Sequence, residues 1–430
     1  MPSLLMISQL VLYPIMLLCA VLVQEQPEQV HLSYTGDPTS MTVTWTTFGL
    51  TKSVVEFSAL PGPITFNLSA YGNDTLFVDG GELKRKLFIH RVTLQGLIPG
   101  HKYAYHCGSD LGWSPIFSFR AIQSGSAWGP RLVVFGDMGN ENAQSLPRLQ
   151  KDTQMDMYDA VLHVGDFAYD MEKDNAQVGD EFMRQIETVA AYVPYMTCPG
   201  NHEEAYNFSN YRNRFSMPGN TEGLWYSYDL GPAHIISLST EVYFYMEYGK
   251  ELVGEQYKWL QKDLQEATRP SQRAERPWII TMGHRPMYCS NFDRDDCVLL
   301  QSVVRTGISG GLYGLEDLFY KYGVDLEIWA HEHSYERLYP IYNYTMYKGS
   351  QEAPYTNPTA PVHIITGSAG CNERLDPFFP LHHEWSAVRI ADYGYTRMHI
   401  ANKTHIHIQQ VSDDQEGKIV DDFWLIKDRH

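Results

Sequence analysis

Short runs in which apolar and polar residues alternate fill the chain from about residue 27 to residue 120. They are rich in β-branched and aromatic residues, and Gly and Pro separate them. The clearest runs are MTVTWTTF (Met41 to Phe48), KLFIHRVTL (Lys86 to Leu94) and YAYHCG (Tyr103 to Gly108). This period-two pattern predicts strands, and strands this short favour a fibronectin-III-like β-sandwich of about 100 residues. We assign the sandwich to residues 24–122, with Trp45 and Tyr103 in its core.

The pattern changes after a linker at residues 121–130. Short apolar runs now alternate with longer stretches of helical character, such as Glu181 to Val193 and Gly254 to Ala267. That alternation is typical of α/β or mixed layered architecture, which we assign to residues 128–430. Strand patterns return after Ala360, and we expect residues 346–430 to complete this second domain rather than to form a third.

The first 23 residues are apolar and carry no charge. They predict a secretory signal peptide, residues 1–23, cleaved between Ala20 and Gln24. The alternative is a retained signal anchor, since the length just reaches a membrane span. Apart from that alternative, we expect no stable membrane span after cleavage, and a secreted, extracellular or lysosomal protein. Five Asn-x-Ser/Thr acceptors agree with this route; they are Asn67, Asn73, Asn207, Asn343 and Asn402.

The chain is acidic, with a formal net charge of -18 over 430 residues. This charge argues against nucleic-acid backbones and anionic membrane surfaces as partners. A phosphate-bearing substrate would need strong local positive charge, which a metal centre could supply. Five cysteines lie outside the predicted leader, and no two of them form a Cys-x-x-Cys pair. We therefore expect no thiolate zinc site. Cys289 and Cys297 are close enough to close a short loop, and at least one cysteine must stay free or pair with another chain.

Five apolar runs end in residues that can bind metal ions. In order, the runs lead into Gly136-Asp137, Gly165-Asp166-Phe167-Ala168-Tyr169-Asp170, Gly200-Asn201-His202-Glu203, Gly283-His284 and Ala330-His331-Glu332-His333. In α/β sheets, functional groups gather at the carboxyl ends of strands, and glycine before a ligand lets the backbone approach closely. Each motif alone is weak, because a single Asp after a strand is usually a turn or cap residue. Their joint occurrence in this order predicts one metal site.

The segment WAHEHSYER, Trp329 to Arg337, raises the question of why histidines alternate with glutamates. In an extended segment, residues i and i+2 point the same way. We therefore expect an extended segment in which His331 and His333 each reach a metal ion, while Glu332 points away. Glu336 and Arg337 are expected to support the site or the fold rather than to act directly.

The blocks GDMG, GDFAYD, GNHE, GHRP and AHEHSYER resemble the metallophosphoesterase motifs GD-x-G, GD-x-x-x-[DY], GNH[DE], H and GH-x-H. Tyr169, three residues after the second Asp, and the preceding sandwich narrow the resemblance to the purple acid phosphatases in their plant-like, longer-chain form. The segment PEQVHLSYTGD, Pro27 to Asp37, also resembles the first strand of that family. The family's usual Gly is Ala330 here, a small-for-small change. The resemblance implies a four-layer α/β/β/α metallophosphoesterase domain behind the sandwich.

Carried over residue by residue, the resemblance implies a ferric ion held by Asp137, Asp166, Tyr169 and His333. A divalent ion would be held by Asp166 as the bridge, with Asn201, His284 and His331. Zinc is the expected divalent ion, with Fe2+ or Mn2+ as alternatives. Carboxylate and phenolate oxygens suit a hard ferric ion, whereas imidazole and amide oxygen suit its divalent partner. His202 is implied to lie near the substrate phosphate and its leaving group.

The implied activity is acid hydrolysis of phosphate monoesters by a metal-activated hydroxide. Three negative ligand charges against five metal charges would leave the site locally positive for an anionic substrate. A protonated His202 could donate to the leaving group at acidic pH. Two alternatives remain: a phosphodiesterase of the same superfamily, which Tyr169 argues against, and a non-catalytic binding protein that retains the metal site. A homodimer is left open.

One stretch departs from the family pattern. Plant-type relatives carry additional substrate-facing histidines after the position of His284, but residues 285–297 contain none. Asp293, Arg294 or Tyr288 are candidates to replace them, with Arg294 as a phosphate clamp. A plain surface loop is the other interpretation.

Overall fold

The computed structural model describes residues 24–292, 297 and 302–427. The predicted signal peptide, together with Asp293 and Arg294, lies outside these residues. Within the described part of the chain, no helix is both long and apolar enough to span a bilayer.

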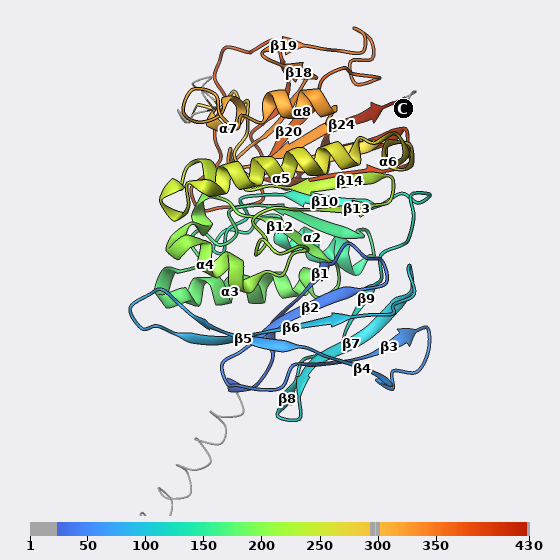
Figure 1. The fold of residues 1–430 in the computed structure, drawn as a ribbon, viewed down its shortest axis with the longest axis vertical. Helices are drawn as coiled ribbons and strands as arrows, with labels where there is room; N and C mark the ends of the chain where they lie inside the picture. Colours follow the sequence, from blue (N-terminus) through green and yellow to red (C-terminus); the bar gives the residue numbers. More distant parts are fainter. Residues whose placement is uncertain (1–23, 293–296, 298–301, 428–430) are drawn as a thin grey trace, which may run out of the picture.

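The N-terminal part is a β-sandwich, as predicted, and Figure 1 shows it at one end of the molecule. One sheet has the order β1-β2-β6-β5 and the other the order β4-β3-β7-β8, with β9 paired to β7. Trp45 and Tyr103 are buried in its core, also as predicted. The strands are β1 (Glu28–Tyr34), β2 (Met41–Thr47), β3 (Val54–Leu60), β4 (Leu68–Tyr71), β5 (Asn73–Val78), β6 (Lys86–Leu94), β7 (Lys102–Ser109), β8 (Gly112–Trp113) and β9 (Phe117–Arg120).

Two further sheets follow, and the five apolar runs that precede candidate ligands all form strands in them. The six-stranded sheet has the order β12-β11-β10-β22-β23-β24, and the seven-stranded sheet has the order β13-β14-β15-β16-β20-β17-β21. The first contains β10 (Arg131–Phe135), β11 (Ala160–Val164), β12 (Tyr195–Cys198), β22 (Gly394–Ile400), β23 (His405–Ser412) and β24 (Lys418–Ile426). The second contains β13 (Tyr226–Leu230), β14 (Ala233–Ser237), β15 (Trp278–Met282), β16 (Leu326–Trp329), β17 (Tyr335–Leu338), β20 (Val362–Thr366) and β21 (Ser386–Ile390). A small pair, β18 (Ile341–Tyr342) and β19 (Thr345–Met346), stands apart.

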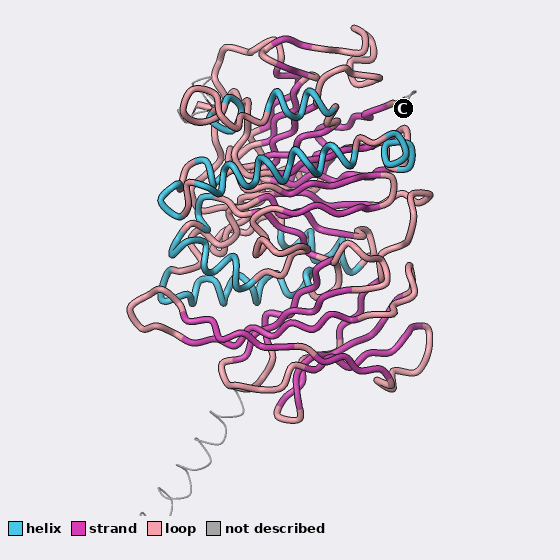
Figure 2. Tube along the Cα trace, viewed as in Figure 1, coloured by secondary structure: helices cyan, strands magenta, loops and turns pink. Residues whose placement is uncertain are grey.

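The two large sheets pack face to face, and helices cover their outer faces (Figures 1 and 2). Alternate residues of β10 show why: Leu132 and Val134 join a core with Ile280 and Ile328 of the other sheet, whereas Val133 packs in the cluster that contains the helices. Period-two burial on both faces requires a strand that is covered on both sides. The helices are α2 (Leu146–Gln154), α3 (Lys173–Ala190), α4 (Ala205–Arg214), α5 (Glu251–Ala267), α6 (Pro270–Glu275), α7 (Val303–Thr306) and α8 (Glu316–Tyr322), and the 3-10 turns are η1 (Asn201–Glu203), η2 (Glu241–Tyr243) and η3 (Met246–Tyr248).

Helices α3 and α4 both begin with a left-handed turn. Residues 174–176 have φ of 50°, 55° and 65°, and residues 206–208 have φ of 56°, 61° and 57°. None of the six residues is glycine. Left-handed backbone costs about 1–2 kcal/mol per L-residue and is ordinarily confined to single positions. Contacts from elsewhere in the fold must therefore hold both turns.

His234 on β14 is hydrogen-bonded to both β13 and α5. Its ionisation predicts that the free energy of unfolding depends on pH. Its ring nitrogens lie 2.8 Å from Asp229 Oδ1 and 2.9 Å from Asp263 Oδ2. Burial lowers the pKa of His234, but the hydrogen bonds to the two carboxylates outweigh it and raise that pKa to about 9. A folded-state pKa above the unfolded value of 6.5 stabilises the protein below pH 6.5, and the stabilisation is lost as pH rises through about 9.

We therefore expect the free energy of unfolding of the wild type to exceed that of His234→Asn by a pH-dependent amount. This amount should reach roughly 3 kcal/mol near pH 6 and vanish in alkali. Denaturant unfolding of both proteins between pH 5.5 and 10 measures it. A difference between the two proteins that stays constant over this range would contradict the assignment.

Candidate metal centre

The candidate ligands lie where neighbouring parallel strands end. β10, β11 and β12 run parallel in one sheet, and β15 and β16 run parallel in the other. Their carboxyl ends lead into Asp137, Asp166, Asn201, His284 and His331. Because the two sheets face each other, ligands from both sheets meet at a single edge.

One group of candidate ligands is rich in oxygen atoms. The Tyr169 hydroxyl lies 3.2 Å from Asp137 Oδ1 and 2.8 Å from His333 Nε2. The His333 Nε2 atom lies 3.5 Å from Asp137 Oδ1. All three residues are buried. A carboxylate, a phenol oxygen and one imidazole nitrogen therefore converge.

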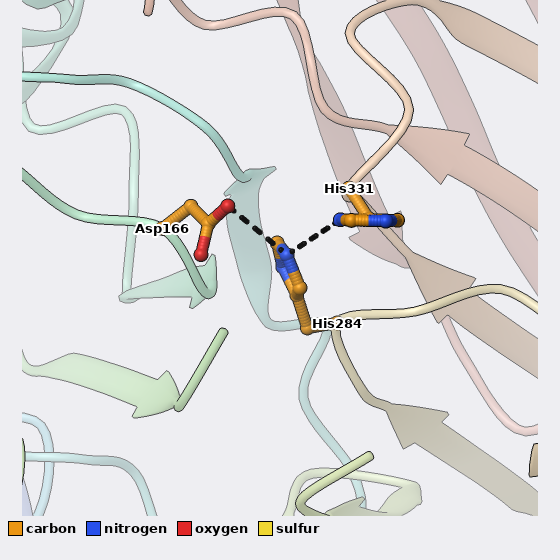
Figure 3. A group of neighbouring side chains, drawn as sticks. All are labelled: Asp166, His284 and His331. Atoms are coloured by element: carbon orange, nitrogen blue, oxygen red, sulfur yellow. Dashed lines mark hydrogen bonds and ion pairs between the residues drawn. The ribbon is translucent and has the colours of Figure 1, made fainter. Parts of the chain in front are cut away.

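The second group adjoins the first and is rich in nitrogen atoms. Single ligand atoms of Asp166, His284 and His331 all lie within 4.8 Å of one another (Figure 3). His284 Nε2 lies 3.2 Å from Asp166 Oδ2, 3.2 Å from His331 Nδ1 and 3.1 Å from Asn201 Oδ1. The His331 backbone N–H donates to Asp137 Oδ2 at 3.0 Å and so joins the two groups.

These donor sets fit a pair of unlike metal ions. The first group offers hard anionic oxygens, and the second offers two imidazole nitrogens and an amide oxygen, which suit a borderline divalent ion. Asp166 Oδ2 faces His284 of the second group, and Asp166 belongs to the same loop as Tyr169 of the first group. The candidate ligands therefore lie in two adjoining groups, one rich in oxygen atoms and one rich in nitrogen atoms.

Two glycines permit this close approach. A Cβ atom at Gly165 would lie 2.4 Å from His284 Nδ1, and one at Gly200 would lie 2.2 Å from Asp166 Oδ1. Gly165 also has a φ of 86°, in the left-handed region that glycine tolerates. Any side chain at either position would displace a candidate ligand.

The expected geometry of the His-Glu-His segment is wrong. His331 has a φ of 71°, and the segment lies beyond the end of β16 rather than in an extended strand. Tight backbone hydrogen bonds join Glu332 N–H to Ala330 O at 2.8 Å and Ser334 N–H to Glu332 O at 2.7 Å. The two histidines reach neighbouring groups through this folded loop, and the i, i+2 alternation of a strand does not explain them. Glu332 does point elsewhere, toward Cys297 Sγ at 3.0 Å.

His202 lies beside the second group and is held by a carboxylate. Its Nδ1 lies 2.5 Å from Asp170 Oδ1, and its Nε2 lies 3.9 Å from Asp166 Oδ2. Asp170 also pairs with Lys173 Nζ at 2.6 Å. The ring is half-buried, with Nε2 on the side of the candidate ligands. Asp170 was quoted with its motif in the sequence but was given no role there.

The protein groups by themselves hold protons that a metal ion must displace. Burial disfavours charge on Asp166, but His284 and His202 outweigh it and hold the pKa of that carboxyl below its usual range. Burial lowers the pKa of His284, but Asp166 outweighs it and raises that pKa to about 10. Burial, and then Asp137 and Asp166, raise the pKa of Tyr169 well above 10. Metal binding at these residues would therefore release protons.

Glu203 is a supporting residue that the sequence did not identify. Its carboxylate is buried and accepts the backbone N–H groups of Asp166, Phe167 and Gly200, each at 2.9 Å. One side chain thereby fixes the loops after β11 and β12. The signal that could have found it is its place in the GNHE block, directly after His202.

Glu203→Gln should weaken metal retention because the amide offers one oxygen acceptor where three N–H donors converge. Changes to residues that orient metal ligands typically cost about 10–100-fold in metal affinity or activity, and we expect a loss in that range. Dialysis against graded chelator, followed by elemental analysis, measures it. Glu204→Gln is the matched control, since the Glu204 side chain accepts only the Tyr248 hydroxyl among the hydrogen bonds of the described residues. Equal retention by both variants would contradict the role of Glu203.

The stretch after His284 differs in part from expectation. Tyr288 is buried and its hydroxyl donates to Glu316, so it does not replace the missing histidines. Cys289 and Cys297 form a disulfide, whereas Cys107, Cys198 and Cys371 are free and buried. Two supporting roles agree with the sequence. Glu336 accepts from Ser290 and Ser386, and Arg337 pairs with Asp421 at 2.7 Å.

Comparison with known proteins gives matches along most of the chain. The family described as purple acid phosphatase, N-terminal domain, matches residues 27–121. Calcineurin-like phosphoesterase matches residues 130–335, and iron/zinc purple acid phosphatase-like protein C matches residues 360–422.

Relatives cover nearly the same length. Acid phosphatase type 7 of Homo sapiens is 67% identical over 402 residues, which are 93% of this chain and 91% of that protein. The protein of the same name in Danio rerio is 60% identical over 94% of this chain and 92% of its own length. The solved structure of a purple acid phosphatase from yellow lupin (Lupinus luteus) seeds shares the fold, with a TM-score of 0.78, 24% identity, and coverage of 94% of this chain and 75% of that one. With this fold, these matching domains and relatives of this identity, the chain belongs to the purple acid phosphatase family.

Proposed function

We propose that this chain, a metal-dependent acid phosphatase by family, hydrolyses phosphate monoesters at a binuclear centre built from Asp137, Asp166, Tyr169, Asn201, His284, His331 and His333. A ferric ion would be held by Asp137, Tyr169, His333 and the shared Asp166. A divalent ion would be held by Asn201, His284, His331 and Asp166. Zinc is the expected divalent ion, since it accepts imidazole and carboxylate ligands readily, and Fe2+ or Mn2+ are alternatives.

The observation that carries the proposal is the convergence of candidate ligands from both sheets at one edge. An oxygen-rich set around Tyr169 and a nitrogen-rich set around His284 adjoin each other, and the His331 N–H to Asp137 hydrogen bond links them. When bound, two such ions would bind phosphate oxygens and acidify a water for attack on phosphorus.

The protein side chains divide the remaining work. The half-buried His202 ring is oriented by Asp170, which accepts from Nδ1 and leaves Nε2 toward the reaction site. An N–H at Nε2 can donate to the leaving-group oxygen as the ester bond breaks. Without metal ions, burial lowers the pKa of His202, but the charge of Asp166 and the hydrogen bond to Asp170 raise it to about 9. The hydrogen bond to Asp170 does not depend on the ions, so it favours the protonated ring in acid. Glu203 fixes the loops after β11 and β12 relative to each other.

The runner-up is a phosphodiesterase of the same superfamily. Tyr169 favours the first reading, since its oxygen lies within the candidate ligand set and a phenolate suits a ferric ion. Elemental analysis and a visible spectrum of purified protein test the metal pair. Steady-state kinetics with 4-nitrophenyl phosphate and bis(4-nitrophenyl) phosphate from pH 4 to 8 test the reaction. We expect iron plus one divalent metal, and a monoester preference that is strongest in acid. An iron-free protein that prefers the diester would overturn the proposal, and a protein that binds metal without hydrolysing either ester would favour the binding-protein alternative.

Passage through the secretory pathway is proposed on the leader and the five acceptor sequons. Asn67, Asn73, Asn343 and Asn402 are exposed on the surface, whereas Asn207 is half-buried. Glycans are therefore expected at the four exposed sites in preference to the half-buried Asn207. Secretion into the medium and a mass shift on glycosidase treatment would test this. Analytical sedimentation would measure whether the chain forms a homodimer.

A further inference from the structure

Both left-handed turns are held by one loop of the N-terminal sandwich. This loop, residues 79–85 between β5 and β6, is here named the sandwich hairpin. Arg85 Nη1 donates to Asn175 O at 2.7 Å, and the Leu83 N–H donates to Asn175 Oδ1 at 3.0 Å. The hairpin therefore binds Asn175, the central residue of the first turn, through both its backbone carbonyl and its side chain.

The same hairpin lies against the second turn. A Cβ atom at Gly80 would lie 2.2 Å from ring atoms of Tyr206, so the hairpin backbone touches that ring. Beside it, the buried Asp79 accepts from Asn210 Nδ2 of α4 at 3.4 Å and from the Gly81 N–H at 2.8 Å. Turn 206–208 therefore packs on the hairpin that binds turn 174–176.

A buried charge cluster fastens this contact. Asp180 of α3 forms ion pairs with two arginines: with Arg85 Nη2 of the sandwich at 2.5 Å and with Arg214 Nη2 of α4 at 2.9 Å. The side chains of Asp180 and Arg214 are 2% and 1% exposed, so removing Asp180 would leave the buried charge of Arg214 without its carboxylate partner. Arg214 Nη2 also donates to Ala176 O at 3.1 Å. Two arginines thus bind consecutive carbonyls of the first turn.

At their other ends the two turns reach the reaction site. The first follows Asp170, whose carbonyl accepts the Lys173 N–H at 3.1 Å. The second follows His202, and its Phe208 N–H donates to Glu204 O at 3.0 Å. The two segments meet where His202 Nδ1 contacts Asp170 Oδ1 at 2.5 Å. Each turn is a short, compact link between the sandwich hairpin and one member of the His202–Asp170 pair.

We propose that the sandwich hairpin positions the His202–Asp170 pair, so that the N-terminal sandwich is part of the leaving-group machinery of the second domain. Left-handed turns of non-glycine residues persist only where surrounding contacts over-determine them. Here the hairpin supplies such contacts to both turns, alongside Arg214 of α4, and their release would let segments 170–176 and 202–208 relax and move the His202 ring. Arg85 is thus a positioning residue. The inference rests on the proposed function only for its kinetic consequence.

The test compares Arg85→Ala with Arg91→Ala. Arg91 is also a partly buried arginine of the sandwich, and it donates across the same interface to Asn213 O and Ser216 Oγ, away from both turns. Hydrogen–deuterium exchange of peptides covering 172–177 and 204–209 should be about tenfold faster in Arg85→Ala, as expected when a charge-assisted hydrogen bond is lost. In Arg91→Ala these peptides should exchange as in the wild type.

Kinetics should separate the same pair of variants. A misplaced donor should reduce kcat for 2-glycerophosphate, whose alkoxide leaving group needs a proton, by about tenfold or more. The kcat for 4-nitrophenyl phosphate, whose leaving group is stable as an anion, should change much less. The Arg91→Ala variant should show no such selectivity between the two esters.

Gly80→Ala provides a second route if Arg85→Ala does not fold. The added methyl group would press on the Tyr206 ring without removing any charge, and it should raise exchange in peptide 204–209 and produce the same selectivity between esters. Wild-type exchange in both peptides for all folded hairpin variants would overturn the inference. Effects in Arg91→Ala equal to those in Arg85→Ala would also overturn it, because they would reflect general weakening of the interface. A wild type that hydrolyses neither ester would instead refute the proposed function, while the exchange experiment would still test the hairpin.

Discussion

Asp166→Asn is expected to abolish binuclear metal binding and nearly all phosphatase activity. Asp166 is the one candidate ligand assigned to both ions, and its buried carboxylate lies 3.2 Å from His284 Nε2. Asparagine has nearly the same shape but no charge, and its single amide oxygen cannot bridge two cations as an anion does. The loss should exceed the about 100-fold that follows changes to residues which merely support ligands.

Elemental analysis and kinetics on 4-nitrophenyl phosphate measure both effects. Asp159→Asn is the control, because Asp159 precedes β11 at the opposite end of the strand that Asp166 follows. Asp159 accepts the Arg131 N–H at 2.8 Å, so the control also removes a charge that makes a backbone contact. Full turnover by Asp166→Asn would show that the bridging assignment is wrong.

Tyr169→Phe is expected to remove the visible absorption of the iron-loaded protein while leaving part of its activity. A phenolate bound to the proposed ferric ion would give a visible charge-transfer band, and phenylalanine has no oxygen to form it. Burial and the nearby carboxylates raise the pKa of Tyr169 well above 10, so a phenolate at working pH requires a bound cation. The remaining candidate ligands of the ferric site are unchanged, and hydrolysis should fall by no more than about 100-fold.

Visible absorption of the iron-replete variant, with iron content measured on the same sample, gives the result. Tyr335→Phe is the matched control, since its phenol is also fully buried and donates to a carboxylate, Asp421, at 2.8 Å. The control should keep its colour. A Tyr169→Phe protein that retains both iron and the band would remove Tyr169 from the ligand set.

Much of the site could be predicted because its residues follow apolar runs. Each of those runs is a strand, and a parallel sheet brings the ends of its strands to one edge whatever the details of the loops. His331 shows the limit of that reasoning. Its place after β16 was readable, but its φ of 71° and the folded loop around it depend on packing against Asp137 and Gly367 from distant segments.

Supporting residues were harder to predict because their partners are remote in sequence. Glu203 is recognisable only once the loops after β11 and β12 lie side by side, since all but one of its N–H donors come from another loop. Arg85 gives no chemical signal in the sandwich sequence. Its role depends on meeting Asn175 and Asp180, 90 and 95 residues later in the chain.

The sequence by itself determined the order of domains, the strands and the residue types available to bind metal ions, because these follow from local periodicity and from the chemistry of each side chain. Only the tertiary structure decided which atoms of those residues face one another, which carboxylates orient them, and how the sandwich grips the turns beside His202. Such features arise from contacts between segments far apart in the chain, and no local pattern specifies them.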